Sequence, residues 1–315
     1  MDRAVVVDLV RRAMDVSEQQ RPDMAPSHLE VPLSYFRSEE WAAKERTLYE
    51  TSPLALVASS ELSSPDDYLA RDAVGRSVLL TRDHDGVAHA FLNYCRHRGA
   101  EPVLGCGNAR RFTCPYHGWV YDTSGRVVGM PLRDRHDGFD LSPYGLVELP
   151  SEERHGFVWV VLTPGHPIDV AAHLGPLDAE IGALGCASMR YFASHEHARL
   201  DVNWKAVAEG LLDGLHVPFV HAQTFGLNPQ AANVDVSFVD RIGPHVRWGF
   251  PMFLPDDVPR LRELPDEELH AGMLGCVWLI SPGLLLANEL YGVIYADLSP
   301  GRAIDEAYLR YGWLS

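Results

Sequence analysis

Residues 93–122 read NYCRHRGAEPVLGCGNARRFTCPYHGWVYD, and this stretch places two Cys and two His in two short segments. One residue separates Cys95 from His97, two residues separate Cys114 from His117, and sixteen residues lie between the two pairs. Two thiolates and two imidazoles suit a [2Fe–2S] cluster in which Cys holds one iron and His holds the other. The neutral imidazoles lower the negative charge of such a cluster and raise its reduction potential.

A structural zinc ion is the alternative, because two Cys and two His are also a zinc ligand set. Zinc modules usually leave at least two residues inside the first pair and carry their second pair on a helix. Here a single residue separates Cys95 from His97, and both pairs lie beside strand-like runs at 87–94 and 119–122. Gly99 and Gly118 favour tight loops that bring backbone amides close to cluster sulfur atoms. The spacing favours the iron–sulfur interpretation.

The composition indicates a globular protein of two domains. The chain has 315 residues, of which 46 % are hydrophobic, and a formal net charge of −16. We therefore expect neither a nucleic acid nor an anionic membrane as a partner. No apolar run has the length of a membrane span, and the N-terminal sequence lacks the pattern of a signal peptide, so a cytoplasmic location is expected. The cysteines outside the motif are expected to stay reduced there; they are Cys106, Cys186 and Cys276.

The order of sequence patterns predicts an α+β protein. Residues 1–52 have helical patterns, one of them beginning at Ser38, and are expected to pack on the catalytic domain. Residues 53–165 contain short apolar runs broken by Gly, Pro and Asp, which predict a small all-β domain with the two Cys/His loops as neighbouring hairpin tips. Residues 166–315 alternate strand-like and helical patterns, which is typical of an α+β domain.

Four arginines lie within or near the two Cys/His loops of this acidic chain: Arg96, Arg98, Arg110 and Arg111. They are either ordinary solvated loop residues or a local basic patch on which an acidic electron donor docks. The sequence leaves both interpretations open.

A second cluster of metal-ligand residue types lies in DVNWKAVAEGLLDGLHVPFVH, residues 201–221. We predict one helix here, capped by Asp201, with Glu209, Asp213 and His216 on the same side. Pro218 is expected to kink the chain and to bring His221 back towards His216.

Two imidazoles beside a carboxylate indicate a metal site. Two His and one carboxylate form the facial triad of non-haem Fe(II) oxygenases, which leaves coordination positions open. The alternative is that His216 and His221 only satisfy a helix end. An electron-storing cluster in the same chain favours iron, because O₂ activation consumes electrons that arrive singly.

The two motifs together resemble those of the large (α) subunit of Rieske non-haem iron oxygenases, the ring-hydroxylating family, over roughly residues 33–315. The resemblance implies a Rieske cluster, a mononuclear Fe(II) and a carboxylate that bridges them. The cluster ligands would be Cys95, His97, Cys114 and His117; the iron ligands would be His216 and His221; the bridge would be Asp213. In the family this carboxylate hydrogen-bonds an iron-bound His, here His216, and a cluster His of the neighbouring subunit, here His117.

The resemblance also implies a fold and an activity. The fold is an all-β Rieske domain beside a catalytic domain with an antiparallel sheet flanked by helices, and the subunits form a head-to-tail homotrimer, with or without a β subunit. The activity is O₂-dependent hydroxylation of an organic substrate, aromatic or otherwise apolar. Electrons come from NAD(P)H through a reductase or ferredoxin.

Two features depart from the family pattern. Gly210 and Leu215 replace an Asn and a Tyr that the family often has next to the iron. The family's third iron ligand is a carboxylate on a later helix, and residue 315 comes before that helix, so we expect a C-terminally truncated form. The alternative is an iron that is held by two His and by a water or foreign ligand. The acids available before residue 315 are Glu289, Asp297, Asp305 and Glu306. The alternative function is a Rieske electron carrier without a functional mononuclear iron.

Downstream aromatic residues either line an apolar substrate pocket or belong to the core. They are Phe225, Trp248, Phe250, Phe253 and Trp278. Trp248 and Phe250 are expected to share one face of a strand.

Overall fold

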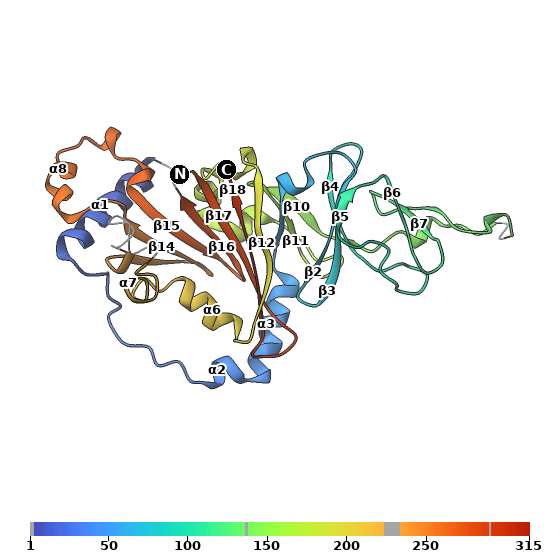
Figure 1. Ribbon diagram of the computed structural model, residues 1–315, viewed down its shortest axis with the longest axis horizontal. Helices are drawn as coiled ribbons and strands as arrows, with labels where there is room; N and C mark the ends of the chain where they lie inside the picture. Colours follow the sequence, from blue (N-terminus) through green and yellow to red (C-terminus); the bar gives the residue numbers. More distant parts are fainter. Residues whose placement is uncertain (1–2, 136–137, 224–233, 290) are drawn as a thin grey trace. The chain divides into compact units, whose positions relative to one another are not determined.

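The computed structural model describes residues 3–135, 138–223, 234–289 and 291–315 (Figure 1). The side chains of residues 193–199 and 289 lie outside this description. The chain forms two compact units, one made of Met1–Ala42 and Leu174–Ser315, here called the sheet unit, and one made of Ala43–His173, here called the cluster-loop unit. The domain limits expected after residues 52 and 165 stay a prediction.

The cluster-loop unit consists of three small antiparallel sheets, as its short apolar runs predicted. The five-stranded sheet has the order β5 (Cys106–Asn108), β2 (Asp67–Ala73), β3 (Arg76–Arg82), β4 (Ala88–Leu92) and β9 (Glu148–Leu149). The two three-stranded sheets are β6 (Arg111–Thr113), β7 (Val120–Asp122) and β8 (Val127–Gly129), and β1 (Leu54–Ala58), β11 (Phe157–Val160) and β10 (Ser151–Arg154).

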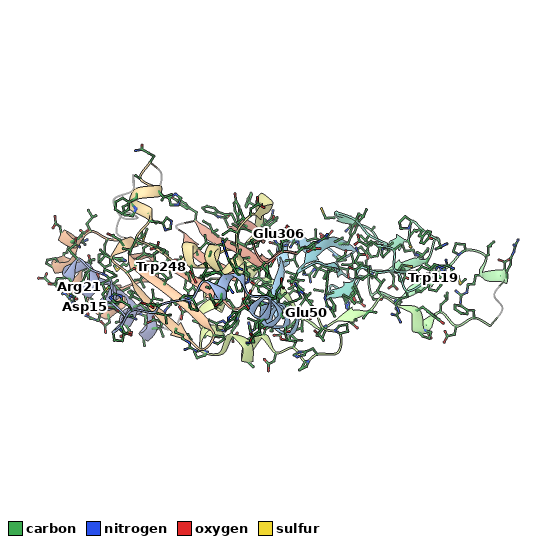
Figure 2. The ribbon with its side chains drawn as sticks, turned by 90° about the horizontal axis from the view of Figure 1, so that it is seen from below. Asp15, Arg21, Glu50, Trp119, Trp248 and Glu306 are labelled. Atoms are coloured by element: carbon green, nitrogen blue, oxygen red, sulfur yellow. The ribbon has the colours of Figure 1, made fainter. Side chains whose placement is uncertain are left out.

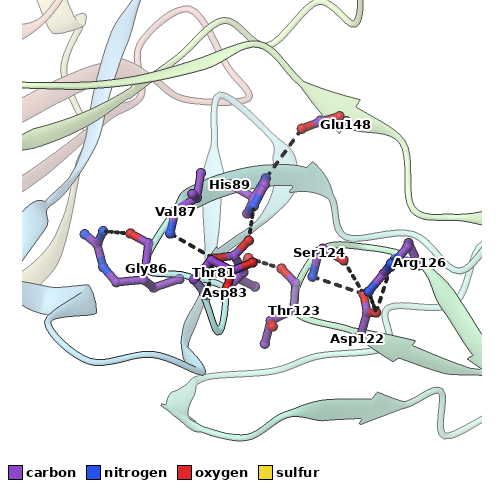
Figure 3. Close-up of polar contacts among 12 residues, drawn as sticks. Thr81, Asp83, Gly86, Val87, His89, Asp122, Thr123, Ser124, Arg126 and Glu148 are labelled. Carbon is purple, nitrogen blue, oxygen red and sulfur yellow. Dashed lines mark hydrogen bonds and ion pairs between the residues drawn. The ribbon is translucent and has the colours of Figure 1, made fainter.

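Tight turns connect these strands and are held by side-chain hydrogen bonds (Figure 3). Asp83 accepts the backbone N–H of Val87 at 2.8 Å and lies 3.0 Å from His89 Nε2. Asp122 accepts the backbone N–H groups of Ser124 and Arg126 at 3.1 and 3.0 Å. Short polar side chains that bond to nearby backbone groups favour such turns over continued strands.

The sheet unit is built on one antiparallel sheet of seven strands (Figure 1). Its order is β12 (Tyr191–Leu200), β18 (Ala307–Leu314), β17 (Gly292–Pro300), β16 (Leu284–Glu289), β15 (Leu274–Ile280), β14 (His245–Pro251) and β13 (Phe238–Ile242).

The described residues contain eight α-helices. They are α1 (Arg3–Gln19), α2 (Ser34–Arg37), α3 (Glu39–Thr51), α4 (Val170–Leu174), α5 (Asp178–Gly182), α6 (Trp204–Leu211), α7 (Val217–Val220) and α8 (Val258–Arg262). The helix predicted to begin at Ser38 is confirmed as α3, because Ser38 Oγ accepts the N–H of Glu40 at 3.2 Å. None of the described helices is long and apolar enough to cross a membrane.

The two faces of the seven-stranded sheet have different characters. Neighbouring strands pair Trp248 with Val277 and Arg247 with Trp278, so side chains alternate between the faces. The first face carries a buried apolar cluster that includes Trp248 (Figure 2) and contacts Val217 of α7.

On the second face Arg247 makes a 2.8 Å ion pair with Glu180 of α5, and the Trp278 indole N–H donates to the same carboxylate at 2.8 Å. Trp278 therefore lies opposite Trp248, and of the two interpretations left open the one in which both line a single pocket is wrong. Residues an even number apart share a face only when they lie on the same strand. Trp248 and Trp278 lie on different strands, so the pairing of the strands decides their faces.

Candidate metal centres

The two Cys/His loops have the same backbone hydrogen-bond frame although their Cys-to-His spacings differ. In each loop the Cys N–H donates to the carbonyl five residues further on, and the Cys carbonyl accepts the N–H of the Gly four residues further on. The bonds are Cys95 N–H to Ala100 O (2.8 Å), Gly99 N–H to Cys95 O (2.8 Å), Cys114 N–H to Trp119 O (2.7 Å) and Gly118 N–H to Cys114 O (2.9 Å). Both glycines have a positive φ, 75° and 68°, which favours Gly at these positions.

The thiols and the imidazoles of these loops differ in solvent exposure. Cys95 and Cys114 are 4 % and 2 % exposed, belong to the core of the unit and are free thiols. His97 and His117 lie at the exposed surface, with their Nδ1 atoms 3.2 Å apart.

The histidine geometry fits a shared metal ion. Two nitrogens bound to one tetrahedral metal at about 2.0–2.1 Å lie about 3.3–3.4 Å apart. Partial desolvation lowers the pKa of His117, and the charges of His97 and Arg98 lower it further, which favours the neutral, ligating form of the ring. Together with the buried thiols of the same two loops, these residues provide the two Cys and two His of a Rieske-type [2Fe–2S] ligand set, and their assignment as ligands stays a prediction.

Tyr121, on the strand that follows the second Cys/His loop, contacts the first Cys/His loop. Its hydroxyl donates to Cys95 Sγ at 3.1 Å and accepts the backbone N–H of Arg96 at 3.0 Å. Burial, followed by the hydrogen bond to Cys95, raises the pKa of Tyr121, so the hydroxyl stays protonated and remains a donor. The sequence analysis missed this residue, because only the fold brings β7 against the first loop.

Each imidazole is flanked by an aromatic ring. The Trp119 ring is parallel to His97, with centroids 5.3 Å apart and 4° between the planes. The Tyr116 ring lies 3.9 Å from His117 at an angle of 37°. Trp119 is buried, whereas Tyr116 is 61 % exposed.

The four loop arginines do not form one uniform group. Arg110 makes a 3.1 Å ion pair with Asp66, which compensates its charge. Arg110 and Arg111 also line a depression of about 450 Å³ whose wall contains four aspartates. Both arginines lie at the start of β6, whereas Cys114 follows the end of that strand. Arg96 and Arg98 lie in the first loop itself and are exposed. The docking role predicted for this group stays a prediction.

The second motif does not form the single helix that the sequence predicted. The helix α6 is capped by Asn203, whose Oδ1 accepts the N–H of Lys205 at 3.0 Å, and not by Asp201, which is exposed. It ends at Leu211, before the Asp and both His of the motif. The expectation of one helix, with a shared side for the acids and His216, is therefore wrong.

One local and one long-range feature explain the end of α6. Asp213 Oδ1 accepts the N–H of Leu215 at 2.8 Å, a side-chain bond that competes with the helix. Gly214 packs so closely that a Cβ there would lie 2.3 Å from Val234 O and 2.9 Å from the Trp248 ring. Pro218 lies in the first turn of α7, where proline is favoured, and does not kink a longer helix.

The structure nevertheless places the two imidazoles of this motif side by side. The rings of His216 and His221 have centroids 5.2 Å apart at 66°. Asp213 Oδ2 lies 3.6 Å from His216 Nδ1, which directs the other ring nitrogen, Nε2, away from the carboxylate. A carboxylate on one ring nitrogen and a metal on the other is the common arrangement of metal-binding His. Glu209 is exposed in α6, one to two turns before them.

No third protein ligand lies beside this pair in the described residues. Within them, no group of three or more His, Cys, Asp or Glu side chains is placed to hold one metal ion. Asp297 makes a 2.9 Å ion pair with Arg310, and Glu306 accepts the N–H of Arg302 at 2.9 Å. Asp305 is exposed, and the Glu289 side chain lies outside the described residues. Two imidazoles with one nearby carboxylate fit a mononuclear Fe(II), and this assignment stays a prediction.

The sheet face near this motif is apolar. The buried cluster contains Trp248, Val277, Leu285 and Ala296 and is contacted by Phe250, whose ring lies 5.1 Å from Trp248. Phe253 is buried, and Phe225 lies outside the described residues.

A polar clamp that the sequence analysis missed holds the start of α6. Asn203 Nδ2 donates to Phe36 O at 2.9 Å and to Ile304 O at 2.8 Å. The Lys205 ammonium lies over the rings of Tyr35 and Trp41, 3.9 and 5.9 Å from their centroids. The helix that leads to Asp213 is thus tied to the N-terminal segment.

Comparison with known proteins agrees with both motifs. The Rieske [2Fe-2S] domain matches residues 52–148, and the catalytic domain of the ring-hydroxylating alpha subunit matches residues 187–270. The chain is 27 % identical over 201 residues to the carnitine monooxygenase oxygenase subunit of Acinetobacter baumannii, covering 64 % of this chain and 54 % of that one. It is 32 % identical over 190 residues to the large oxygenase component of a Ralstonia naphthalene 1,2-dioxygenase system, covering 57 % and 41 %.

The fold is shared with a crystal structure of a quaternary ammonium Rieske monooxygenase in complex with L-carnitine. The TM-score is 0.75 at 21 % identity, over 90 % of this chain and 74 % of that one. The chain thus aligns with about half the length of the curated relatives.

The fold and the two sequence matches define a protein with a Rieske [2Fe-2S] domain and the catalytic domain of a ring-hydroxylating alpha subunit. The relatives that the chain resembles are oxygenase large subunits, among them a monooxygenase and a dioxygenase component.

Proposed function

We propose that this chain is the terminal oxygenase component of a Rieske oxygenase system. The system would use O₂ and electrons from NAD(P)H, delivered in the cytoplasm by a reductase or ferredoxin, to hydroxylate an organic substrate. The observation that carries the proposal is the presence of two separate metal-ligand groups in one chain: two buried thiols with paired imidazoles, and His216 beside His221 with Asp213 adjacent.

The two metal groups would supply electron storage and a site for O₂ activation. Cys95 and Cys114 would hold one iron of the cluster in the dry core, and His97 and His117 would hold the other at the surface. His216 and His221 would hold the mononuclear Fe(II). Asp213, whose Oδ2 lies 3.6 Å from His216 Nδ1, would favour the proton on that nitrogen by electrostatic attraction, which keeps Nε2 deprotonated and available to the metal.

Electron transfer between the two groups would occur between subunits of a head-to-tail homotrimer. Asp213 is exposed, and so are the imidazoles of the cluster loops, so each group can meet its counterpart on another copy. The segment around Asp213 also exposes three large apolar side chains: Leu215 at 63 %, Phe219 at 85 % and Val220 at 70 %. Such exposed apolar groups mark interaction surfaces. A β subunit is compatible with this assembly.

The substrate would be aromatic or otherwise apolar. The sheet face that carries Trp248 and Phe250 supplies hydrophobic surface beside the Asp213–His216 segment, since Gly214 packs directly on the Trp248 ring. Apolar walls with a few polar groups are typical of small-molecule sites.

The first experiment is to measure iron and acid-labile sulfide per chain in anaerobically purified protein, with electron paramagnetic resonance after dithionite reduction. A rhombic Rieske signal together with one iron beyond the cluster pair is expected. NAD(P)H oxidation coupled to O₂ uptake and a hydroxylated product, with a reductase present, would complete the test. Zinc without sulfide would refute the proposal.

The Asp213→Asn variant tests the proposed coupling role. It should keep the cluster signal and the mononuclear iron but lose coupled product formation, because the neutral amide no longer orients His216 in the same way. Glu209→Gln, an exposed acid in α6, is the matched control and should retain activity. Full activity of Asp213→Asn would contradict the assigned role.

A second candidate is a Rieske electron carrier that lacks a functional mononuclear iron. The ligand set that is described at the second motif is sparse, two imidazoles in ring contact with Asp213 Oδ2 3.6 Å from His216 Nδ1, and this favours the carrier. A Rieske signal with iron for the cluster alone, and no O₂ uptake, would support this carrier.

A further inference from the structure

A row of aromatic rings extends from one imidazole of the cluster loops to the surface of the cluster-loop unit. Trp119 is stacked on His97 at 5.3 Å, and Tyr144 meets Trp119 edge-on with centroids 5.8 Å apart. Phe139 stacks on Tyr144 at 5.3 Å and 25°. Trp119, which is labelled in Figure 2, is buried, whereas Phe139 at the outer end is 40 % exposed.

The outer part of this row is held in place by its own segment. Asp140 accepts the N–H and the hydroxyl of Ser142 at 2.9 and 2.7 Å, and the backbone hydrogen bond from Ser142 is the main cause that lowers the pKa of Asp140. Leu141 is buried in the core, and its carbonyl accepts the N–H of Tyr144 at 3.0 Å. Phe139 and Tyr144 are therefore anchored on both sides of one short turn.

The two imidazoles differ in this respect. His117 is flanked by Tyr116, which is mostly exposed. The His117 ring is the one that the family resemblance pairs with Asp213 of a neighbouring copy. His97 is flanked by the buried Trp119 and, through it, by the row that ends at Phe139. Each imidazole is therefore in contact with a different set of aromatic rings, and each set reaches the protein surface.

We propose that the row Phe139–Tyr144–Trp119 is the entry path for electrons and that the surface at Phe139 is the docking site of a one-electron carrier protein. This inference rests on the proposed function, because it assumes that His97 is a cluster ligand. In each transfer the carrier is oxidised by one electron and the cluster is reduced by one electron; no bond forms or breaks. Packed rings provide continuous contact between the docked carrier and His97, and electronic coupling falls steeply across gaps between groups.

A purely structural role for the rings is the alternative, since aromatic contacts also stabilise a core. The two roles separate when the cluster is reduced by two different reagents. A protein carrier must deliver electrons where it docks, whereas dithionite is small and reaches the exposed His97 and His117 directly. Only the first reaction should depend on the outer rings.

The experiment measures cluster reduction by stopped-flow absorbance in the full chain, with a reduced plant-type [2Fe–2S] ferredoxin as the protein probe and with dithionite. Tyr144→Leu removes the middle ring, and Phe139→Ala removes the exposed one. Both should slow reduction by ferredoxin several-fold and leave the dithionite rate unchanged. Tyr144→Phe, which keeps the ring, should restore the parent rate.

Tyr116→Leu is the matched control, because it removes an exposed ring from the other imidazole and should leave the ferredoxin rate unchanged. The inference is overturned if Tyr144→Leu and Phe139→Ala both react with ferredoxin as fast as the parent, or if each slows both reagents equally. The electron paramagnetic resonance signal of each variant reports whether the cluster is intact. A parent chain without that signal would refute the proposed function itself.

Discussion

The hydroxyl of Tyr121 donates a hydrogen bond to Sγ of Cys95 across 3.1 Å. The tyrosine is on β7 and the cysteine is in the first Cys/His loop, so this bond fixes the distance between the two halves of the proposed cluster site. Hydrogen bonds to cluster sulfur atoms stabilise the reduced, more negative state and raise the reduction potential.

Tyr121→Phe should lower the reduction potential of the cluster. A loss of about 1 kcal/mol of preferential stabilisation of the reduced state corresponds to about 40 mV for one electron. The measurement is a redox titration followed by electron paramagnetic resonance. Tyr94→Phe is the control, because the Tyr94 hydroxyl accepts the backbone N–H of Ser77 at 3.1 Å. An equal shift in both variants would mean that the thiolate contact is not the cause.

Gly214 should tolerate no side chain. A Cβ at this position would lie 2.3 Å from the carbonyl oxygen of Val234, so Gly214→Ala must displace the segment between Asp213 and His216. Overpacking of this kind costs about 1–3 kcal/mol, and we expect a loss of mononuclear iron with the Rieske signal retained.

Gly210 provides the matched control for Gly214. Gly210 is part of α6 and comes four residues before Gly214 in the chain. No atom lies within 4 Å of a Cβ built at Gly210. Gly210→Ala should stabilise the chain by up to about 1 kcal/mol, because Ala favours a helix more than Gly does. Urea unfolding and iron analysis of both variants check the pair. Equal iron content in the two would contradict the assigned role of Gly214.

The most accurate sequence-based predictions concern structural features that are set by residues close together in the chain. The short turn-rich strands of the cluster-loop unit, the helix that follows Ser38 and the α+β class were all read from local patterns, and the structure confirms them. The loop glycines at 99 and 118 were predictable for the same reason, since their positive φ is a local property.

Contacts between distant segments were not predictable from local patterns. The motif of residues 201–221 has good helical periodicity, yet Gly214 packs against Val234 and Trp248, and this contact ends the helix. Trp278 was grouped with Trp248 because both are aromatic, whereas the strand register assigns them to opposite faces. The hydrogen bond from Tyr121 to Cys95 likewise exists only after β7 has paired with its neighbours.

Asn203 should contribute more to stability than an ordinary helix cap. Its Oδ1 caps α6, and its Nδ2 donates to the carbonyls of Phe36 and Ile304. Asn203→Ala should therefore cost about 2–4 kcal/mol, above the cost of a lost cap alone. Asn203→Ser keeps a capping oxygen but loses both donated bonds, so its stability in urea should lie between the Ala variant and the parent. A Ser variant as stable as the parent would mean that the donated bonds contribute nothing.

Asp83 should make the stability of the cluster-loop unit depend on pH through His89, which lies between Asp83 and Glu148 (Figure 3). Burial alone would raise the pKa of Asp83, but hydrogen bonds from His89 and from the backbone of Val87 and Asp85 outweigh it and hold the pKa below its usual range. A carboxyl with a lowered pKa stabilises the folded state above its unfolded pKa of about 3.9, and this contribution is lost as the pH falls through the folded value.

His89→Leu should therefore be less stable than the parent at about pH 7, by about 0.5–1.5 kcal/mol for the lost hydrogen bond, and the difference should narrow below about pH 4. Urea unfolding across this range measures it. His84→Leu changes an exposed histidine of the same turn and should leave the pH profile of the parent unchanged. A His89→Leu deficit that stays constant from neutral to acidic pH would show that the ring contributes by packing against Phe91, 5.8 Å away, and not through the ionised Asp83.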